Sequence, residues 1–361
     1  MPDIAPIIKP EAVTAKWLTT VLQSGGHLGV SRVAEVEVEP YRRKPNSSLV
    51  TIRATYEPAL ADLPTAFMLK IARIDVTTST AIRRRRREHV FYNQLAPVMT
   101  NPPVPRCFSS VLTPDAHSGH LLLEDLSAST TRPPRGLPSS PQQALGAMVA
   151  LAKVHAAWWE DQELIAASDH RDQSWFDERE RSARNAGMAI LEELGDFLAP
   201  SMRDAISRAL AVWPDLLRGH GDPLTLVHGD AHPWNCLTPL DGGPSILLDW
   251  EGWTIEPATY DLAAFISSRF DLASQLELTH PMLRTYHNTL VANGIDWPWD
   301  TFLASYRNAV LRRVMTPVSQ WRNNEEPEQW WNMLSRVSMA LIAIEDGTMF
   351  VAPDVYSSDE A

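Results

Sequence analysis

The sequence has few cysteines, and basic residues are outnumbered by acidic ones. Cys107 and Cys236 are the only two cysteines in 361 residues, which excludes a disulfide scaffold and predicts a reducing, cytoplasmic location. The net charge is −12 and the pI is near 5.4. A protein that binds nucleic acid or an anionic membrane surface is usually basic, so neither partner is expected.

Long apolar runs are also missing. The most apolar stretch, ALGAMVALAKVHAAWW, is interrupted by Lys153 and His155, and no window approaches the roughly 18 apolar residues of a membrane span. The N-terminal residues lack a basic segment followed by an apolar one, so no signal peptide is predicted. No internal repeat is present, and no pattern predicts an oligomeric state.

The residues that are present indicate a globular chain large enough for two lobes, with 44% hydrophobic and 21% charged residues. Between 31 and 75 the pattern alternates and is rich in Val, Ile and Thr, which predicts three strands. A helix is expected over 78–97, followed by strands near 107–112 and 119–124. The first part of the chain therefore predicts a small antiparallel sheet with one long helix against it.

Proline and serine crowd into the segment 127–141, which marks a boundary between two lobes. We predict a β-rich lobe over 1–126 and a larger, mostly helical lobe over 127–361. Two of the helices expected in the second lobe cover 257–275 and 280–293. The predicted fold class is α+β.

The densest group of polar side chains lies in LTLVHGDAHPWNCL, residues 224–237. Strand-like LTLV and SILL flank a turn at 239–244, which predicts a β-hairpin that returns Asp249 to the neighbourhood of Asn235. Phosphoryl transfer needs a carboxylate such as Asp230 to accept a hydroxyl proton. It also needs an amide and a second carboxylate for magnesium, which prefers oxygen ligands.

The segment also has other interpretations. A polar turn with a capping aspartate is one. A zinc site built from His228, His232 and Cys236 is another, but Gly229 and Pro233 disfavour the continuous helix that their spacing would need. Nucleophilic catalysis by Cys236 would require a nearby base, for which His232 is the candidate.

The stretch VHGDAHPWNCL, followed by ILLDWEGWTIEPATYDLA, resembles the aminoglycoside phosphotransferase and choline/ecdysteroid kinase-like superfamily. Its members are small-molecule kinases with a protein-kinase-like fold. The resemblance implies that Asp230 is the catalytic base and that Asn235 and Asp249 are magnesium ligands. It also implies that His228 and Asp261 support the loop.

The resemblance extends into the first lobe. AFMLKIA resembles the strand whose lysine, here Lys70, contacts the nucleotide phosphates, and REHVFYNQLAP resembles the helix whose glutamate, here Glu88, pairs with that lysine. LLLEDL resembles the hinge strand that contacts adenine, between Glu124 and Leu126. Lys70 interrupts an apolar strand, and a buried ammonium ion is costly unless it is paired. The alternative partner for Glu88 is one of the arginines 83–87.

One element departs from the family pattern. The turn over the phosphates usually contains glycine, but here it reads YRRKPNSSLV. Asn46, Ser47 and Ser48 can form a turn and offer amides and hydroxyls, although backbone approach to phosphate is less free than with glycine. This departure supports an alternative function, a nucleotide-binding pseudokinase or scaffold without transfer activity.

Taken together, the resemblance implies a two-lobed, protein-kinase-like kinase that uses ATP and Mg²⁺ to phosphorylate an alcohol group. The small acceptor would be aminoglycoside-, amino-sugar- or choline-like. Trp234, next to Asn235, is expected to contact it because the loop faces the acceptor. In the family, the late helical segments, here with Trp321, Trp330 and Trp331, often line the substrate side, and aromatic faces attract cationic amines. Several acidic residues beyond position 265 could hold an amine, although any surface helix carries such residues: Glu277, Asp296, Asp300, Glu325, Glu326 and Glu328.

Overall fold

The computed structural model divides into two compact units. Unit 1 comprises Met1–Thr131 and the returning segment, Ile246–Trp253, and unit 2 comprises Arg132–Ser245 and Thr254–Ala361. The sequence predicts a single boundary at 126/127. In the structure the first boundary lies at 131/132, and a second segment, Ile246–Trp253, belongs to unit 1. The residues that the structure describes are 4–59, 63–134, 139–167 and 171–350.

Unit 1 is built on an antiparallel sheet of six strands in the order β1-β3-β4-β6-β5, with β2 paired to β3. The alternating, β-branched pattern of this part of the chain is the physical basis of the sheet. The strands of unit 1 outside the returning segment are β1 (Arg32–Val38), β2 (Arg42–Arg43), β3 (Ser47–Glu57), β4 (Ala66–Ala72), β5 (Cys107–Leu112), β6 (Gly119–Glu124) and β7 (Thr130–Thr131).

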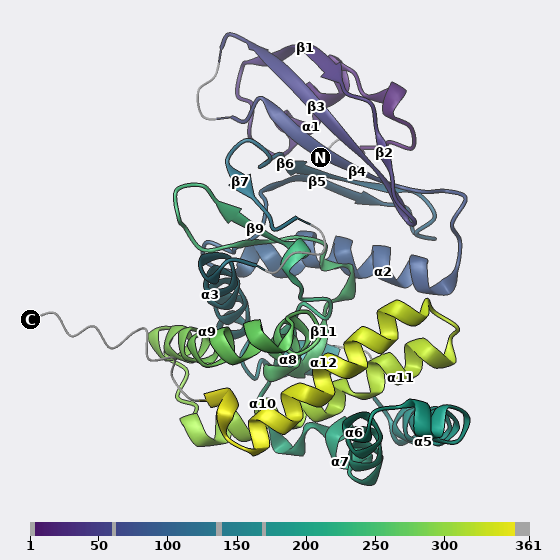
Figure 1. The fold of residues 1–361 in the computed structure, drawn as a ribbon. Coiled ribbons are helices and arrows are strands. Elements are labelled where there is room, and N and C mark those ends of the chain that lie inside the picture. The colour runs from purple at the N-terminus through teal and green to yellow at the C-terminus, as the bar shows by residue number, and fades with distance from the viewer. Residues whose placement is uncertain (1–3, 60–62, 135–138, 168–170, 351–361) are drawn as a thin grey trace, which may run out of the picture. The chain divides into compact units, whose positions relative to one another are not determined.

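The two faces of this sheet carry different elements. Helix α1 (Ala15–Ser24) supplies Leu18 to a core that includes Leu69 of β4. Because successive side chains of a strand point to opposite faces, Lys70 lies on the other face. Helix α2 (Ser79–Val90) runs along that second face (Figure 1), as the sequence predicts.

The returning segment, which includes β10 (Ile246–Leu247), is packed onto α2 and the residues that follow it. The Trp250 indole stacks on the Phe91 ring with centroids 3.9 Å apart. Trp253 Nε1 donates a hydrogen bond of 2.7 Å to the Arg87 carbonyl. These contacts attach residues distant in sequence to unit 1.

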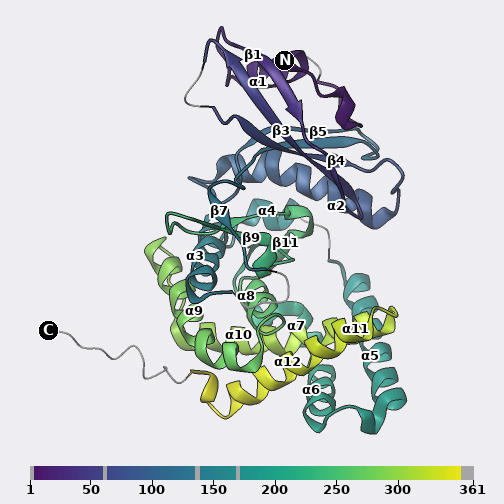
Figure 2. The same ribbon diagram turned by 45° about the horizontal axis from the view of Figure 1, so that its top comes forward.

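Unit 2 is mostly helical, with α3 packed on α9 and with α12 packed on α6, α9, α10 and α11 (Figure 2). None of the described helices is both long and apolar enough for a membrane span. The helices are α3 (Pro141–Ala157), α4 (Gln162–Ala167), α5 (Gln173–Leu194), α6 (Pro200–Ala211), α7 (Trp213–Arg218), α8 (Thr259–Ile266), α9 (Leu272–Ala292), α10 (Trp299–Arg313), α11 (Met315–Arg322) and α12 (Pro327–Glu345).

The helix boundaries around position 270 differ from the prediction. The expected helix over 257–275 ends early, at Ile266, and α9 begins at Leu272. The Asp271 carboxylate caps α9 by accepting from the Ser274 N–H at 2.9 Å. Pro281 lies inside α9, so the predicted interruption before it was wrong.

The turn expected at 239–244 is present between two strands, but the strand before it is Cys236–Pro239 and not Leu224–Val227. Strand β8 (Leu224–Val227) pairs antiparallel with β11 (Thr254–Pro257), not with the residues that precede Asp249. The chain reaches β11 directly after the returning segment, whose tryptophans are engaged in unit 1. Strand β9 (Cys236–Pro239) follows the polar loop in unit 2.

Candidate active site

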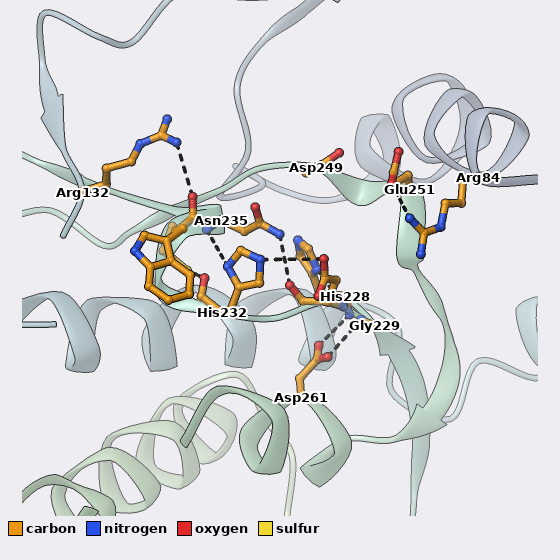
Figure 3. A network of polar contacts seen from close by, with 12 residues as sticks. Arg84, Arg132, His228, Gly229, His232, Asn235, Asp249, Glu251 and Asp261 are labelled. Carbon is orange, nitrogen blue, oxygen red and sulfur yellow. Dashed lines mark hydrogen bonds and ion pairs between the residues drawn. The ribbon is translucent and has the colours of Figure 1, made fainter. Parts of the chain in front are cut away.

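Unit 1 places one ammonium ion among three carboxylates. Lys70 Nζ lies 2.7 Å from Glu88 Oε1, 2.7 Å from Asp249 Oδ1 and 4.0 Å from Glu251 Oε2. Glu88 is therefore close to Lys70, as the resemblance implies. Arg84, from the run of arginines on α2, pairs with Glu251 at 3.0 Å (Figure 3).

The charges of this group oppose one another. Burial alone would lower the pKa of Lys70, but the three carboxylates raise it, so the ammonium form is retained. Burial raises the pKa of Glu88 to about 7, against the opposing pull of Lys70. Oxygens of Glu88, Asp249 and Glu251 lie within 4.8 Å of one another, and such a donor set suits a hard divalent cation.

Asp249 has an unusual backbone conformation. Its φ of 66° and ψ of 61° are left-handed, a region that aspartate enters more readily than most residues with a side chain. Its side chain is 43% exposed, although one oxygen contacts Lys70. The carboxylate is thus held from one side while much of its surface stays accessible.

The turn expected over the phosphates is held by Arg73. Its guanidinium donates to the Lys44 and Pro45 carbonyls at 3.2 and 2.9 Å, and its backbone N–H donates to the Asn46 carbonyl at 3.1 Å. The pairing of β3 with β4 puts Ser47 on the same face as Lys70, where Ser47 is buried, and Ser48 on the opposite face. The Ser47 carbonyl also accepts from the Lys44 N–H at 2.8 Å, so the carbonyls of Asn46 and Ser47 are both bonded within the protein.

The residues expected to contact adenine follow β6. The Glu124 N–H donates to the Arg106 carbonyl at 2.9 Å, and the Leu126 carbonyl accepts from Ser129 N–H at 3.1 Å and Thr130 Oγ1 at 2.8 Å. Among the described residues, the Leu126 N–H has no hydrogen-bond partner. It is the backbone donor of this stretch that a ligand can use.

In unit 2 the polar loop is fixed by a buried carboxylate. Asp261, fully buried on α8, accepts from the His228 N–H at 2.6 Å and from the Gly229 N–H at 3.0 Å. Figure 3 shows the Asp261 carboxylate pointing at these two residues. Gly229 has φ of +79°, which a residue with a side chain adopts at a cost, so the bend just before Asp230 requires glycine.

Two further buried groups support Asp261. His155 Nε2 lies 3.3 Å from Asp261 Oδ2, and His155 Nδ1 lies 2.7 Å from the Tyr286 hydroxyl. Burial alone would raise the pKa of Asp261, but His155 and the loop N–H groups lower it. In the sequence, His155 is interpreted as a packing histidine inside an apolar helix, and nothing in the sequence indicates that it or Tyr286 supports Asp261.

The loop itself orients Asn235 and Asp230. Asn235 Nδ2 donates to the Asp230 carbonyl at 3.1 Å, and the Asn235 N–H donates to His232 Nδ1 at 3.2 Å. His232 Nε2 lies 3.7 Å from Asp230 Oδ2, and the Asp230 side chain is 56% exposed. Because the amide nitrogen of Asn235 is engaged, its Oδ1 is available as an oxygen ligand, which fits magnesium.

The zinc and nucleophile interpretations of this loop are not supported. Within the described residues, His228, His232 and Cys236 do not form a compact group of metal ligands. Burial lowers the pKa of His232 to about 4, partly opposed by Asp230. Burial also raises the pKa of the Cys236 thiol to about 12, so little thiolate forms near neutral pH.

Strand β11, which pairs with β8, is anchored by a buried ion cluster. Glu256 is 5% exposed and lies 2.7 Å from Arg171 and 2.7 Å from Arg312. Burial alone would raise the pKa of Glu256, but both arginines lower it. The cluster holds the pair of strands from which the loop begins.

Residues 55–302, more than half of the sequence, match the family described as the phosphotransferase enzyme family. The chain belongs to this family. As a phosphotransferase of this family, it carries the ordered set of Lys70, Glu88, Asp230, Asn235 and Asp249 within the matched residues. Comparison with functionally curated proteins gives no match.

Solved structures of similar proteins show the same protein-kinase-like fold. An aminoglycoside phosphotransferase from Alicyclobacillus acidocaldarius is 13% identical over 86% of this chain and 92% of its own, with a TM-score of 0.54. Choline kinase from Cryptosporidium parvum is 10% identical over 92% of this chain and 97% of its own, with a TM-score of 0.54. The GDP complex of aminoglycoside 2'-phosphotransferase-IIIa is 12% identical over 90% and 98%, with a TM-score of 0.53.

The predicted residues of this phosphotransferase are gathered into two groups. Lys70, Glu88 and Asp249 meet within unit 1. Asp230 and Asn235 meet within unit 2. Their roles toward nucleotide, metal and acceptor stay predictions.

Proposed function

We propose that this phosphotransferase is an ATP-dependent small-molecule kinase that transfers the γ-phosphate to a hydroxyl of its acceptor. The observation that carries the proposal is the loop of unit 2. There, Asp261 holds the backbone of 228–229 while the Asp230 carboxylate stays accessible. A carboxylate that is fixed in direction and exposed to a ligand suits the role of a catalytic base.

Unit 1 would bind the nucleotide. The Lys70 ammonium, kept charged by its carboxylate neighbours, anchors the phosphates, and Glu88 holds the lysine in place. The Leu126 N–H is available for adenine, with the neighbouring Glu124 already bonded to Arg106. The turn at Asn46, Ser47 and Ser48 would complete the nucleotide site beside Lys70.

Magnesium would be held by Asn235 Oδ1 and the Asp249 carboxylate. Both are oxygen donors, and the nitrogen of the Asn235 amide is already bonded to the protein. When bound, the ion neutralises the charge that develops on the phosphate oxygens during transfer. Glu251, which lies close to the Asp249 carboxylate, adds negative charge beside this position.

The proposed transfer is a direct exchange of bonds at phosphorus. The acceptor oxygen forms a bond to the γ-phosphorus, while the bond from that phosphorus to the bridging oxygen breaks and ADP leaves with the electron pair. The hydroxyl proton passes to Asp230. Positioning and charge neutralisation supply most of the rate enhancement, so a carboxylate held in one direction is sufficient as the base.

The test is Mg²⁺-dependent ADP release by wild type and by Asp230→Asn, with binding of ATP measured separately. The variant should retain ATP binding and lose at least about 10²-fold in turnover, in the range of general-base contributions. Asp215→Asn, at an exposed aspartate of α7, is the matched control and should behave as wild type. Equal turnover of Asp230→Asn and wild type would refute the role of Asp230.

The acceptor panel should cover amino sugars, aminoglycosides and choline analogues, which are the classes that the family resemblance suggests, together with neutral and anionic hydroxyl compounds. Replacing ATP by GTP in the same assay determines the nucleotide preference. ATP binding without phosphorylation of any acceptor would favour the pseudokinase alternative.

The two cysteines favour a reducing compartment, such as the cytoplasm, as the site of activity.

A further inference from the structure

Three arginines converge beside the polar loop of unit 2. Arg269 follows α8, Arg313 ends α10, and Arg336 lies on α12. Arg313 Nε donates to Ser268 Oγ at 2.9 Å, and Arg336 donates to the Ser268 carbonyl at 3.5 Å. Arg313 and Arg336 therefore meet at Ser268, the residue before Arg269, and the charges of both act on Arg269.

This arginine cluster, Arg269, Arg313 and Arg336, lies next to the catalytic loop. The Arg269 guanidinium is 5.8 Å from the centre of the Trp234 ring, and Trp234 directly precedes Asn235. The charge of Asp230 also reaches Arg269: burial and the neighbouring arginines lower the pKa of Arg269, and Asp230 opposes that shift.

The cluster has no acidic partner in contact. Among the described residues, no carboxylate forms an ion pair with any of the three arginines, and Asp230 is the one carboxylate whose charge acts on Arg269. Arg269 Nε is buried without a hydrogen-bond partner. An arginine carries five N–H donors, so most donors of this cluster are left for a ligand. All three side chains are partly buried, which separates them from ordinary surface arginines.

The acidic residues of the same part of the chain show the opposite distribution. Every described acidic residue beyond position 265 is exposed, including those considered for an amine: Asp271, Glu277, Asp296, Asp300, Glu325, Glu326, Glu328, Glu345 and Asp346. The cation that lies near the face of Trp234 is the guanidinium of Arg269. A cationic acceptor beside Trp234 would therefore be repelled by Arg269, and the aromatic face that could attract it already has a cation beside it.

We propose that the acceptor carries an anionic group, a carboxylate or a phosphate, which Arg269, Arg313 and Arg336 bind while its hydroxyl faces Asp230. Planar guanidinium groups bind such anions in pairs of parallel hydrogen bonds. The proposal rests on the assignment of Asp230 as the base, and it replaces the cationic acceptor that the family resemblance suggests.

The first experiment measures the binding of inorganic sulfate to the wild-type chain by calorimetry. Sulfate presents anionic oxygens without the sugar ring or other framework of an acceptor. Saturable binding is expected, weakened about tenfold or more in Arg269→Gln and Arg313→Gln, because each removes charge-assisted hydrogen bonds. Arg181→Gln, at an exposed arginine of α5, is the matched control. Lys70→Met tests whether sulfate binds at the nucleotide position instead.

Two results would overturn the proposal: no saturable sulfate binding, or equal binding by wild type and Arg269→Gln. Loss of sulfate binding in Lys70→Met alone would also overturn it. A failure of the kinase function is distinguished separately, because it would appear as absent binding of Mg²⁺-ATP or as full turnover in Asp230→Asn.

The second experiment compares acceptors that share one ring: glucuronate, glucose 6-phosphate, glucose and glucosamine. ADP release should be greater with the two anionic sugars than with glucose, and least with glucosamine. The two anionic members distinguish a carboxylate from a phosphate as the bound group. Greater turnover with glucosamine that persists in Arg269→Gln would contradict the proposal.

Discussion

At the scale of single residues, the chemistry depends on how charges are paired in partly buried positions. Lys70 is 17% exposed and contacts two carboxylates. Glu88, at 6% side-chain exposure, is the more deeply buried of these partners, whereas Asp249 is 43% exposed. Glu88 therefore acts mainly on the lysine, and Asp249 remains accessible to a ligand.

Glu88→Gln should reduce kcat/KM for ATP by about tenfold or more, because Lys70 loses a charged partner and turns toward Asp249. The stability cost should be small, since burial already opposes the negative charge of Glu88. Steady-state kinetics with varied ATP and urea unfolding measure the two effects. Glu193→Gln, at an exposed position of α5, is the control, and unchanged kcat/KM in Glu88→Gln would refute this role.

At the scale of elements, the loop depends on the strands and helices around it. Strand β8 ends where the loop begins, and β11 pairs with β8. Glu256 of β11 is held by Arg171 and Arg312, so helices near the C-terminus stabilise a strand pair at the base of the loop. Displacing β11 would loosen the residues that Asp261 positions.

Glu256→Gln should lower the free energy of unfolding by about 3 kcal/mol, because two partly buried guanidinium groups lose their counter-charge. Glu345 offers a matched control: it also pairs with two arginines, Arg208 and Arg307, but at the surface. Glu345→Gln should cost less than about 1 kcal/mol. Urea unfolding at neutral pH measures both, and equal costs would contradict the explanation.

At the scale of the whole molecule, the chain forms two units, and it passes between them at 131/132, 245/246 and 253/254. Unit 1 has its own core around α1 and the sheet. Each unit assembles one group of the proposed catalytic residues, so loss of either unit's packing removes part of the site. Conditions that destabilise one unit should therefore also end activity.

Acid is one such condition for unit 1. Burial lowers the pKa of His89 to about 3 and that of His120 to about 4, from 6.5. His120 Nδ1 accepts from the Ile7 N–H at 3.0 Å, which requires a neutral ring. The unfolded chain takes up these protons below pH 6.5 and the folded chain does not. Stability should therefore fall as pH falls from 6.5 to 4, by about 1.4 kcal/mol per pH unit for each ring.

Glu88 changes stability in the opposite direction between pH 4.5 and 7. Because its pKa is raised in the folded chain, the folded chain takes up this proton before the unfolded chain does, and stability from this group rises as pH falls. His120→Gln isolates one ring: glutamine can accept from Ile7 without taking up a proton, so the slope of stability against pH should decrease by about one proton. His117→Gln, at an exposed histidine, is the matched control for the substitution itself. Urea unfolding between pH 5 and 7 makes the comparison, and identical slopes for wild type and His120→Gln would refute the assignment.

The sequence predicted much of the fold and of the candidate site. The antiparallel sheet followed from alternation, and the ordered Lys70, Glu88, Asp230, Asn235 and Asp249 followed from motif resemblance. The partner of β8 was predicted wrongly, because strand pairing depends on which segments are adjacent after folding. The break before α9 was also missed. The prediction placed the interruption before Pro281, whereas the helix begins after the N-cap residue Asp271 and continues through the proline.

By itself, the sequence determined the local patterns: which segments are strands or helices, and which residue types recur in the spacing of the phosphotransferase family. Only the tertiary structure decided that Ile246–Trp253 packs into unit 1, that His155 and Tyr286 stand behind Asp261, and that Arg313 and Arg336 meet at Ser268, next to Arg269. The reason is physical. Periodicity and spacing record contacts between neighbours along the chain, whereas burial and charge pairing arise between segments that meet only after folding.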